Sequence, residues 1–339
     1  MNDWKRSVCR GRCGWLVAVL GVCLLIAGCD REPTAAEPGR PAAGSAHAAE
    51  VTPPSTTLQR VTIAAMNLEN FFDEHNDPYT DDQGTAPKTA DEMRVLAKVI
   101  NEIDADFLGI VEVETEGVMR QFADRYLADR RYDQIYVAHR DYGRGINNGA
   151  MSRVPIRTVA NYRFRKLTVP GRDDVWQFAR DVVGFDIEPK PGVTMRLFVV
   201  HFKSKRDSRG DPDSHHWRLS EAMEVRRIVE QQLADDPDAM IAVMGDFNDL
   251  PDSEQLKTLL APGADGKPVL IDAHAGLDRD QRITYLREPY RSTIDYMLLS
   301  PAMAALVVPG SARVVNDESL LDATDHAAVM ATFRLPAAQ

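Results

Sequence analysis

The chain has 339 residues, of which 51 are acidic and 40 basic, and its formal net charge is −11; 44% of the residues are hydrophobic. This length and composition are typical of a globular protein with one large domain or two small ones. The acidic excess argues against a protein that coats nucleic acid by charge alone, because such binding relies on many Lys and Arg side chains. A nuclease is not excluded, because an acidic cleft can bind Mg²⁺ or Ca²⁺ and contact phosphate through the metal.

The first 28 residues have the pattern of an export signal. Four basic side chains lie within the first 12 residues, and an apolar stretch at residues 15–27 is too short for a comfortable membrane-spanning helix. This stretch ends in Ile26-Ala27-Gly28-Cys29, which resembles the cleavage site of a bacterial lipoprotein. We therefore expect residues 1–28 to be a lipoprotein signal peptide, with Cys29 lipidated and the domain held at a membrane on the extracytoplasmic, periplasmic side. An uncleaved membrane anchor is the alternative.

All four cysteines, Cys9, Cys13, Cys23 and Cys29, lie in or directly after this segment. The mature chain would keep Cys29 alone, with its sulfur acylated. We therefore expect no disulfide framework, no thiolate metal site and no cysteine nucleophile. Loss of residues 1–28 removes four basic residues and one acidic residue, which leaves 36 basic against 50 acidic residues and a net charge of −14.

Residues 29–59 are interpreted as the lipidated cysteine and a flexible tether, because they are rich in Ala, Pro, Glu, Gly and Ser. Residues 60–336 are expected to form one domain. Apolar spacing predicts amphipathic helices at residues 89–103 and 219–233, and Thr89 with Glu92 has the pattern of a capping box. Short apolar runs predict strands at residues 61–66, 107–111, 150–151, 182–187, 197–202, 241–244, 296–299 and 328–333. Many strands with few helices between them favour stacked sheets flanked by helices over a doubly wound parallel sheet.

Polar side chains lie at one end of five expected strands, where they would not contribute to the packing of an apolar core. A single such group is most often a solvated strand end, but five with amide, carboxylate and imidazole groups favour a shared site at one rim. Two of them close together could hold a divalent metal and a phosphate. The five are Asn67-Leu68-Glu69-Asn70, Glu112-Val113-Glu114, His201-Phe202-Lys203-Ser204, Gly245-Asp246-Phe247-Asn248 and Thr324-Asp325-His326.

In this order, and with Ile294-Asp295-Tyr296 before the last, the segments resemble the motifs of the endonuclease/exonuclease/phosphatase superfamily. That superfamily includes pancreatic deoxyribonuclease and the exonuclease III type of abasic-site endonuclease. Its usual pattern has Ser where this chain has Thr324, a change that keeps the hydroxyl. The resemblance covers residues 60–335. It implies an α/β (α+β) fold, a four-layer α/β/β/α sandwich of two packed mixed sheets flanked by helices.

The resemblance implies a metal site made of oxygen ligands. Glu112 would be the main ligand, and Asn67, Glu69 and Asp325 would complete or orient the site. Hard carboxylates suit Mg²⁺, which keeps several waters and binds few protein groups. Mn²⁺ or Ca²⁺ is the alternative.

The resemblance also implies a set of catalytic residues. His326 would activate the attacking water or hold the scissile phosphate, and Asp295 would fix the tautomer of its ring. Asp246 and Asn248 would position the nucleophile and bind a phosphate oxygen, or help a second metal. His201 matches a histidine of the deoxyribonuclease branch, where it would protonate the leaving oxygen; the abasic-site branch lacks it.

Basic and amide side chains outside these roles are candidates for substrate binding. Arg144 and Asn148 lie in a Gly-containing segment that precedes an expected strand, and Lys203 and Lys205 follow His201. Such groups suit contacts with a nucleic-acid backbone. A solvated hairpin and an ordinary surface loop are the alternative interpretations of the two segments.

We expect a monomeric, metal-dependent phosphodiester hydrolase, an endonuclease that cleaves DNA or RNA by in-line attack of water without a covalent intermediate. The same resemblance covers enzymes that act on phospholipid, sphingomyelin or inositol phosphates, and a membrane-tethered acidic domain fits that alternative too. A non-catalytic binding module is a third interpretation. Such modules usually lose motif residues, and none is replaced in this chain.

Overall fold

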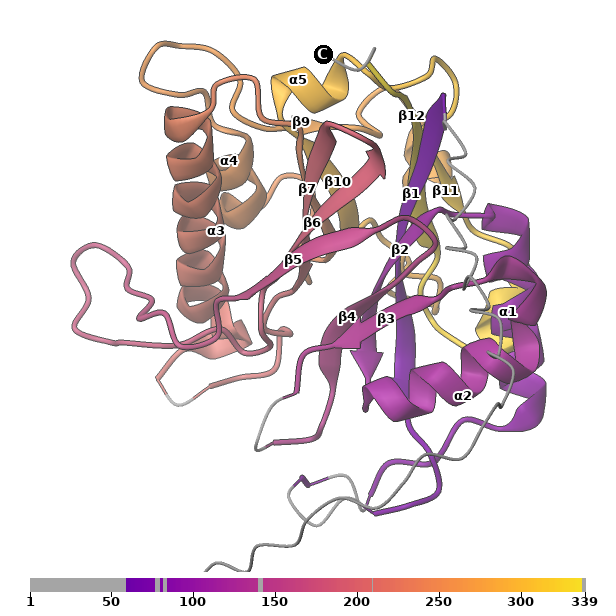
Figure 1. The fold of residues 1–339 in the computed structure, drawn as a ribbon. Helices are drawn as coiled ribbons and strands as arrows, with labels where there is room; N and C mark the ends of the chain where they lie inside the picture. The colour runs from indigo at the N-terminus through magenta and orange to yellow at the C-terminus, as the bar shows by residue number, and fades with distance from the viewer. Residues whose placement is uncertain (1–58, 77–79, 82–83, 140–142, 209, 337–339) are drawn as a thin grey trace, which may run out of the picture. The chain divides into compact units, whose positions relative to one another are not determined.

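The computed structural model describes residues 59–76, 80–81, 84–139, 143–208 and 210–336 (Figure 1). These residues belong to one compact unit, Ser55–Gln339. The expected signal peptide, Cys29 and the tether up to residue 58 lie outside the described residues. Within the described ranges, no helix has the length and apolarity that crossing a membrane requires.

Two six-stranded sheets form the centre of this unit. Parallel pairing occurs once in each sheet, and the other neighbours are antiparallel, so both sheets are mixed. In strand order, the first consists of β11 (Arg313–Val315), β12 (Ala328–Arg334), β1 (Arg60–Phe71), β2 (Phe107–Val113), β4 (Asn147–Ser152) and β3 (Gln134–Val137). The second consists of β5 (Ile156–Asn161), β6 (Val183–Lys190), β7 (Val193–His201), β8 (Ile241–Asp246), β10 (Asp295–Leu299) and β9 (Ile271–Asp272).

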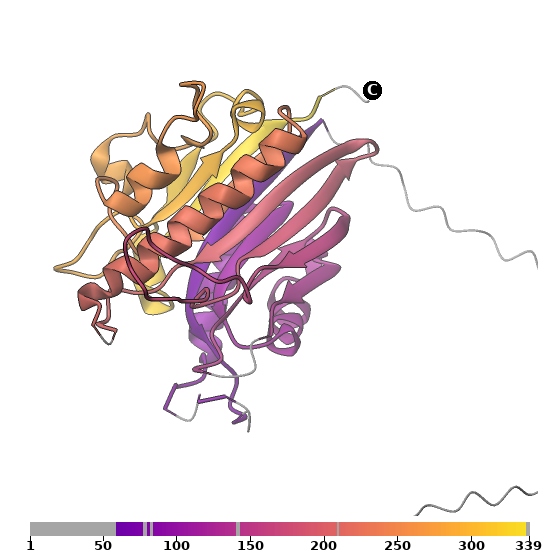
Figure 2. The ribbon, with the colours of Figure 1, turned by 90° about the vertical axis from the view of Figure 1, so that its left-hand side faces the viewer.

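Helices cover the outer faces of both sheets. On the first sheet lie α1 (Ala90–Ile103) and α2 (Glu116–Tyr126), and on the second lie α3 (His215–Asp235) and α4 (Glu254–Leu260), which Figure 2 shows face-on. This four-layer α/β/β/α arrangement confirms the fold class expected from the sequence. The short helical elements are α5 (Pro301–Ala304), η1 (Ala128–Arg130), η2 (Pro212–Ser214), η3 (Arg279–Arg282) and η4 (Glu318–Asp322).

Alternation along the strands explains the layers. In β1, Ile63 and Ala65 pack between the two sheets with residues such as Phe185, whereas Ala64 and Met66 pack toward the helical layer of α1. Successive side chains of a strand point to opposite faces, so a strand that is apolar at every position is buried on both. A third apolar cluster fills the space between the second sheet and the layer of α3 and α4.

The expected helices are both present, with one change of bounds. α1 begins at Ala90 after Thr89, and both hydrogen bonds of the predicted capping box form. α3 begins at His215, four residues before the expected start, and ends at Asp235, two residues after the expected end. Two charged side chains of its first turns, Arg218 and Glu221, are buried, and they interrupt the apolar pattern of the helix. The sequence did not predict α2, α4, α5, β3, β5, β9 or β11.

The topology brings the polar strand ends to one edge of the two sheets. β8 lies between β7 and β10, so Asp246 is paired in register with both His201 and Asp295. β12 is antiparallel to β1, so the segment that leads into β12 reaches the end of β1. Asn67 and His326, 259 positions apart in the chain, therefore come within hydrogen-bond distance.

Candidate active site

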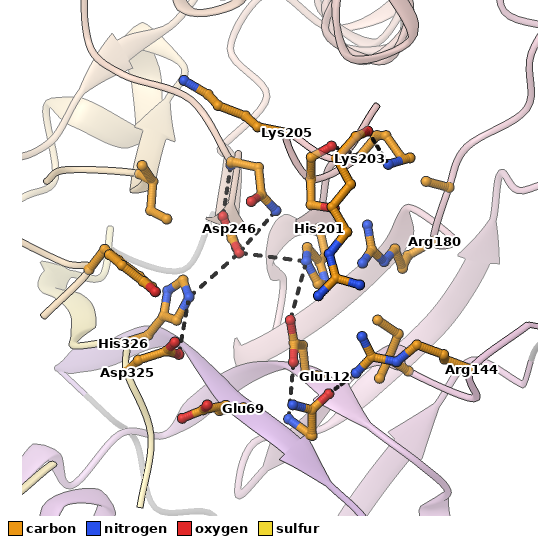
Figure 3. A pocket seen from close by; sticks show the side chains of 18 of the residues that line it. Glu69, Glu112, Arg144, Arg180, His201, Lys203, Lys205, Asp246, Asp325 and His326 are labelled. Carbon is orange, nitrogen blue, oxygen red and sulfur yellow. Dashed lines mark hydrogen bonds and ion pairs between the residues drawn. The ribbon is translucent and has the colours of Figure 1, made fainter. Parts of the chain in front are cut away.

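A cleft of about 890 Å³ opens where the strand ends meet (Figure 3). Two predicted site residues, Asn67 and Asp295, lie buried directly behind its wall and bond to residues that line it. A concave site with convergent polar groups is the usual form of a ligand-binding site. The predicted residues that line the cleft are Glu69, Glu112, Arg144, His201, Lys203, Lys205, Asp246, Asn248, Asp325 and His326.

His326 and Asp295 form a buried acid–base pair. Asp295 Oδ2 lies 2.8 Å from His326 Nδ1, so Nε2 is the ring nitrogen that faces the cleft. Burial opposes a charged ring, but the Asp295 carboxylate, followed by those of Asp246 and Asp325, outweighs it and raises the pKa of His326 to about 10. His326 is therefore an imidazolium at neutral pH.

Asp246 is held at the centre of the site by amides. Its Oδ2 accepts hydrogen bonds from Asn67 Nδ2 and Asn248 Nδ2, both at 3.2 Å, and its Oδ1 accepts from the Asn248 backbone at 2.7 Å. Burial, followed by the neighbouring Asp295 carboxylate, raises the pKa of Asp246 to about 7. Gly245 is required here, because a Cβ atom at this position would collide with the Val200 carbonyl oxygen.

Four motif residues adopt the left-handed backbone conformation that non-glycine residues rarely take. Glu69, Asn70, Glu112 and Asn248 have φ between 45° and 60°. Such conformations persist when the surroundings fix them, and they cluster at functional sites. Two local bonds fix the first three: Glu112 Oε2 accepts from the Asn70 backbone at 3.0 Å, and Asn67 Oδ1 accepts from the Glu69 backbone at 2.9 Å. The bond from the Asn248 backbone to Asp246 holds the fourth.

Three carboxylates on the floor of the cleft offer a donor set for a divalent metal. Glu69, Glu112 and Asp325 all line the cleft (Figure 3), and burial together with the Asp325 charge raises the pKa of Glu69. Their oxygen atoms suit a hard cation such as Mg²⁺. Arg287 lies against two of them, with its Nη2 3.0 Å from Glu69 and its Nε 3.8 Å from Asp325. The oxygen atoms of these three residues have the chemistry that a divalent metal requires, but among the described residues the three do not form a group whose ligand atoms all lie within 4.8 Å of one another.

Asp246, Asp295 and His326 are a second group with metal-ligand chemistry, because one ligand atom of each lies within 4.8 Å of the others. The hydrogen bond between His326 Nδ1 and Asp295 Oδ2 already uses two of the available ligand atoms. The other carboxylate oxygen of Asp295 is buried and has no hydrogen-bond partner among the described residues, so this group is also a candidate metal site.

His201 lies between the two acidic groups of the cleft. Its Nε2 is 3.5 Å from Asp246 Oδ2 and 3.7 Å from Glu112 Oε1. Burial and the nearby Arg180 charge hold the pKa of His201 well below its usual value, so its ring is neutral. A neutral ring with Nε2 directed at carboxylates carries its proton on that nitrogen.

Cationic side chains line the cleft near His201 (Figure 3). Arg144 donates to the Asn70 side chain, which ties it to the first motif. Lys203 Nζ donates to two backbone carbonyls and lies over the Trp217 ring at 5.7 Å. Lys205 pairs with Asp249 at 3.0 Å. Arg206 and Arg291 also line the cleft, so a substrate would meet several positive charges.

The sequence pattern of the Endonuclease/Exonuclease/phosphatase family matches residues 62–323. The chain belongs to this family. It is therefore a hydrolase of a superfamily whose members cleave phosphoesters. Among curated proteins, none matches the chain.

Solved structures of the family share the fold at low sequence identity. The human nocturnin catalytic domain with bound sulfate is 17% identical, with a TM-score of 0.58, and the match covers 82% of this chain and 95% of that one. D. rerio TDP2 complexed with a single-strand DNA product is 19% identical, with a TM-score of 0.52 and coverages of 81% and 98%. A Bacteroides thetaiotaomicron family protein is 16% identical, with a TM-score of 0.50 and coverages of 80% and 97%.

One predicted substrate-binding residue of this family member does not reach the cleft. Asn148 is 0% exposed, and its Nδ2 donates to the Asp181 carbonyl at 2.7 Å. Its neighbour Asn147 lines the cleft instead, because successive side chains of β4 point to opposite faces. The structure therefore corrects the expected phosphate contact of Asn148, which has a structural role.

Arg180 lines the cleft and was missed by the sequence reasoning. It lies in the segment before β6, where no apolar strand precedes it, so the strand-end pattern did not find it. Its Nη1 donates to the Phe202 carbonyl at 3.2 Å. Among the described residues it makes no hydrogen bond to a carboxylate, so its remaining N–H groups can bind a substrate anion, although the charges of Glu112, Glu221 and Asp246 lie nearby.

Proposed function

We propose that this protein is a metal-dependent phosphodiesterase that cleaves nucleic acid, DNA or RNA, as a membrane-anchored extracytoplasmic enzyme. The observation that carries the proposal is the union, in one cleft, of a carboxylate floor, a cationic His326 and several Arg and Lys side chains. Carboxylates suit a divalent metal, and the cations suit a polyanion. Neither group alone would select a phosphodiester.

In the proposed reaction the chain's own residues orient water and phosphate. Glu69, Glu112 and Asp325 would hold Mg²⁺, or Mn²⁺ or Ca²⁺ in its place, and the bound metal would supply positive charge for the phosphate oxygens. Asp246, with a pKa of about 7, suits removal of a proton from the attacking water at neutral pH. His326, held cationic by Asp295, would hold a phosphate oxygen through Nε2–H.

The proposed role of His201 differs from the one that the family resemblance implied. A histidine that protonates the leaving oxygen must carry an extra proton, whereas the low pKa of His201 keeps its ring neutral. We therefore assign His201 to hydrogen bonding and to the placement of Asp246 and Glu112, which its Nε2 faces.

An extended strand is favoured over a small phosphoester by the space beside the cleft. A second cavity of about 560 Å³ adjoins it and shares Leu250, Arg291 and Ser292 with it. Its other walls include Arg279 and Ile283, so it offers both a cation and an apolar surface. A cation there can bind a neighbouring phosphate, and an apolar wall can contact a sugar or base. D. rerio TDP2, which shares the fold, has been solved in complex with a single-strand DNA product, and this supports the proposal.

A lipid phosphodiesterase is the second candidate function. Tyr290 and Leu250 line the cleft with 73% and 39% of their surface exposed, and exposed apolar groups beside a site can contact a bilayer. The predicted lipid on Cys29 would keep the domain close to such a surface. Tyr290 can equally stack on a nucleobase, so the side chains on the rim do not favour lipid over nucleic acid.

The experiment is a substrate panel with the unit from Ser55 onward. We expect plasmid DNA or RNA to be cut in Mg²⁺ or Mn²⁺ and to stay intact in chelator, with short dinucleotides cut more slowly than longer oligonucleotides. Phospholipid vesicles, sphingomyelin and inositol phosphates are assayed in parallel. Hydrolysis of a lipid without cleavage of any nucleic acid would replace the proposal with the second candidate. No hydrolysis in the whole panel would exclude both.

A further inference from the structure

Two charged side chains of α3 are buried beneath the cleft without lining it. Arg218 is 2% exposed and Glu221 is 0% exposed. Both bind the backbone of Lys203: Glu221 Oε2 accepts from its N–H at 2.7 Å, and Arg218 Nη1 donates to its carbonyl at 3.1 Å. The position of the Lys203 backbone is thus fixed from α3 on both sides of the residue.

Glu221 also reaches the other segment that carries a cleft cation. Its Oε1 accepts from the Ala179 backbone at 2.8 Å, directly before Arg180. The two segments, one before β6 and one after β7, meet again where Arg180 donates to the Phe202 carbonyl. One carboxylate therefore links the backbones that place Arg180 and Lys203 in the cleft.

Burial of the Glu221 carboxylate has a cost in folding free energy. A charged group without solvent must be offset by hydrogen bonds and by opposite charges. Glu221 has two backbone N–H donors and the nearby charges of Arg180 and Arg218, yet burial still raises its pKa to about 7. The fold therefore buries Glu221 at a cost in free energy. Each of its two oxygens binds a different cleft segment, and an apolar side chain could not make these bonds.

We propose that Glu221 is a positioning residue for substrate binding, which fixes Arg180 and Lys203 at the places where they meet substrate phosphate. The inference rests on the proposed function and adds to it a residue outside the cleft. Glutamine in its place has the same shape, but its amide nitrogen is a donor. One of the two backbone N–H groups would then lose its acceptor, and one segment would move away.

The test compares Glu221→Gln with Glu224→Gln in KM and kcat for an oligonucleotide. Glu224 lies one turn along α3 and pairs with Arg165 and Arg227 away from the cleft, so it is the matched control. We expect E221Q to raise KM about tenfold with little change in kcat, and E224Q to stay within about twofold of wild type. In an R180Q/K203Q background, E221Q should add no further rise in KM.

Binding of inorganic phosphate in chelator, followed by calorimetry, keeps the inference separate from the nuclease proposal. E221Q should bind phosphate more weakly than E224Q whether or not any nucleic acid is cleaved. If E221Q does not fold, Glu221→Asp keeps the charge and shortens its reach, and a smaller rise in KM is expected. Equal KM and equal phosphate binding in E221Q and E224Q, or a full additional effect in the R180Q/K203Q background, would overturn the inference.

Discussion

At the scale of single residues, the two histidines of the cleft differ in charge because their neighbours differ. His326 is hydrogen-bonded to Asp295, and this carboxylate keeps it cationic although it is buried. His201 has Arg180 nearby and no hydrogen bond at Nδ1 among the described residues, so burial keeps it neutral. The same residue type therefore offers a fixed positive charge at one point and a neutral N–H donor at another.

Replacing Asp295 by Asn tests the source of the His326 charge. We expect kcat to fall by about two orders of magnitude, the range for loss of one preorganised charged donor to the phosphate oxygens. The pKa of His326 is raised to about 10 in the native protein, so its charge persists up to that pH and is lost above it. Without the Asp295 charge this loss moves to lower pH. The measurement is the pH profile of kcat/KM, in which the alkaline limb should shift downward.

Asp174→Asn is the control for this prediction, because Asp174 pairs with Arg172 in the segment between β5 and β6 and does not line the cleft. Its profile should match the native one. If D295N kept its alkaline limb at the native pH, Asp295 would not set the charge of His326.

The sequence revealed those site residues that follow buried strands. An apolar run that ends in Asp246 or Glu112 is visible without a structure, because a polar group at that point contrasts with its neighbours. Arg180 follows no strand, and Glu221 lies within a helix where a charged residue is expected to face water. Their roles depend on which segments the fold brings together, which the sequence pattern does not contain.

At the scale of elements, α3 shows why the predicted bounds were too short. Its apolar spacing becomes regular only after Leu219, whereas the helix begins at His215. The first turns bury Arg218 and Glu221 instead of apolar groups, and their partners lie in other segments, Asp249 and Ala179 among them. Burial by tertiary hydrogen bonds is invisible to an apolar pattern. The edge strand β5 was missed for the opposite reason, because most of its residues are exposed.

The pH dependence of the free energy of unfolding gives a separate test of the burial of Glu221. Its pKa rises from an ordinary 4.5 to about 7 on folding, so the folded protein binds the proton more tightly than the unfolded chain. This contribution is fully present below pH 4.5 and is lost as pH rises through 7. A shift of this size corresponds to about 3 kcal/mol. Urea unfolding should therefore show a smaller decline in stability between pH 5 and 8 for E221Q than for the native protein.

The comparison uses the difference between the two proteins, because Asp246 and His326 also have shifted pKa values and contribute equally to both. E224Q again serves as the control and should follow the native pH dependence. Parallel curves for E221Q and the native protein would mean that the pKa of Glu221 does not change on folding, because its hydrogen bonds and the nearby Arg charges fully offset its burial.

At the scale of the whole molecule, the chain combines a family domain with an N-terminal segment of a different kind. The domain was predictable because six motifs in a fixed order identify a topology, and the two six-stranded sheets with their outer helices confirm it. The substrate could not be predicted. The cleft offers cations for any phosphodiester, and its exposed Tyr290 could contact either a nucleobase or a lipid. The N-terminal segment lies outside the described residues, and its role stays a prediction from residue pattern.

Cys29→Ser tests the predicted lipid anchor in the full chain. We expect the native protein to incorporate labelled palmitate, to begin at residue 29 and to partition with membranes, because an acylated cysteine gives the domain an apolar attachment. Cys29→Ser removes the sulfur that carries the lipid, so the label should be absent. Cys23→Ser, inside the expected signal peptide, should leave labelling intact. A native protein that keeps residues 1–28 and takes up no label would instead support the uncleaved anchor.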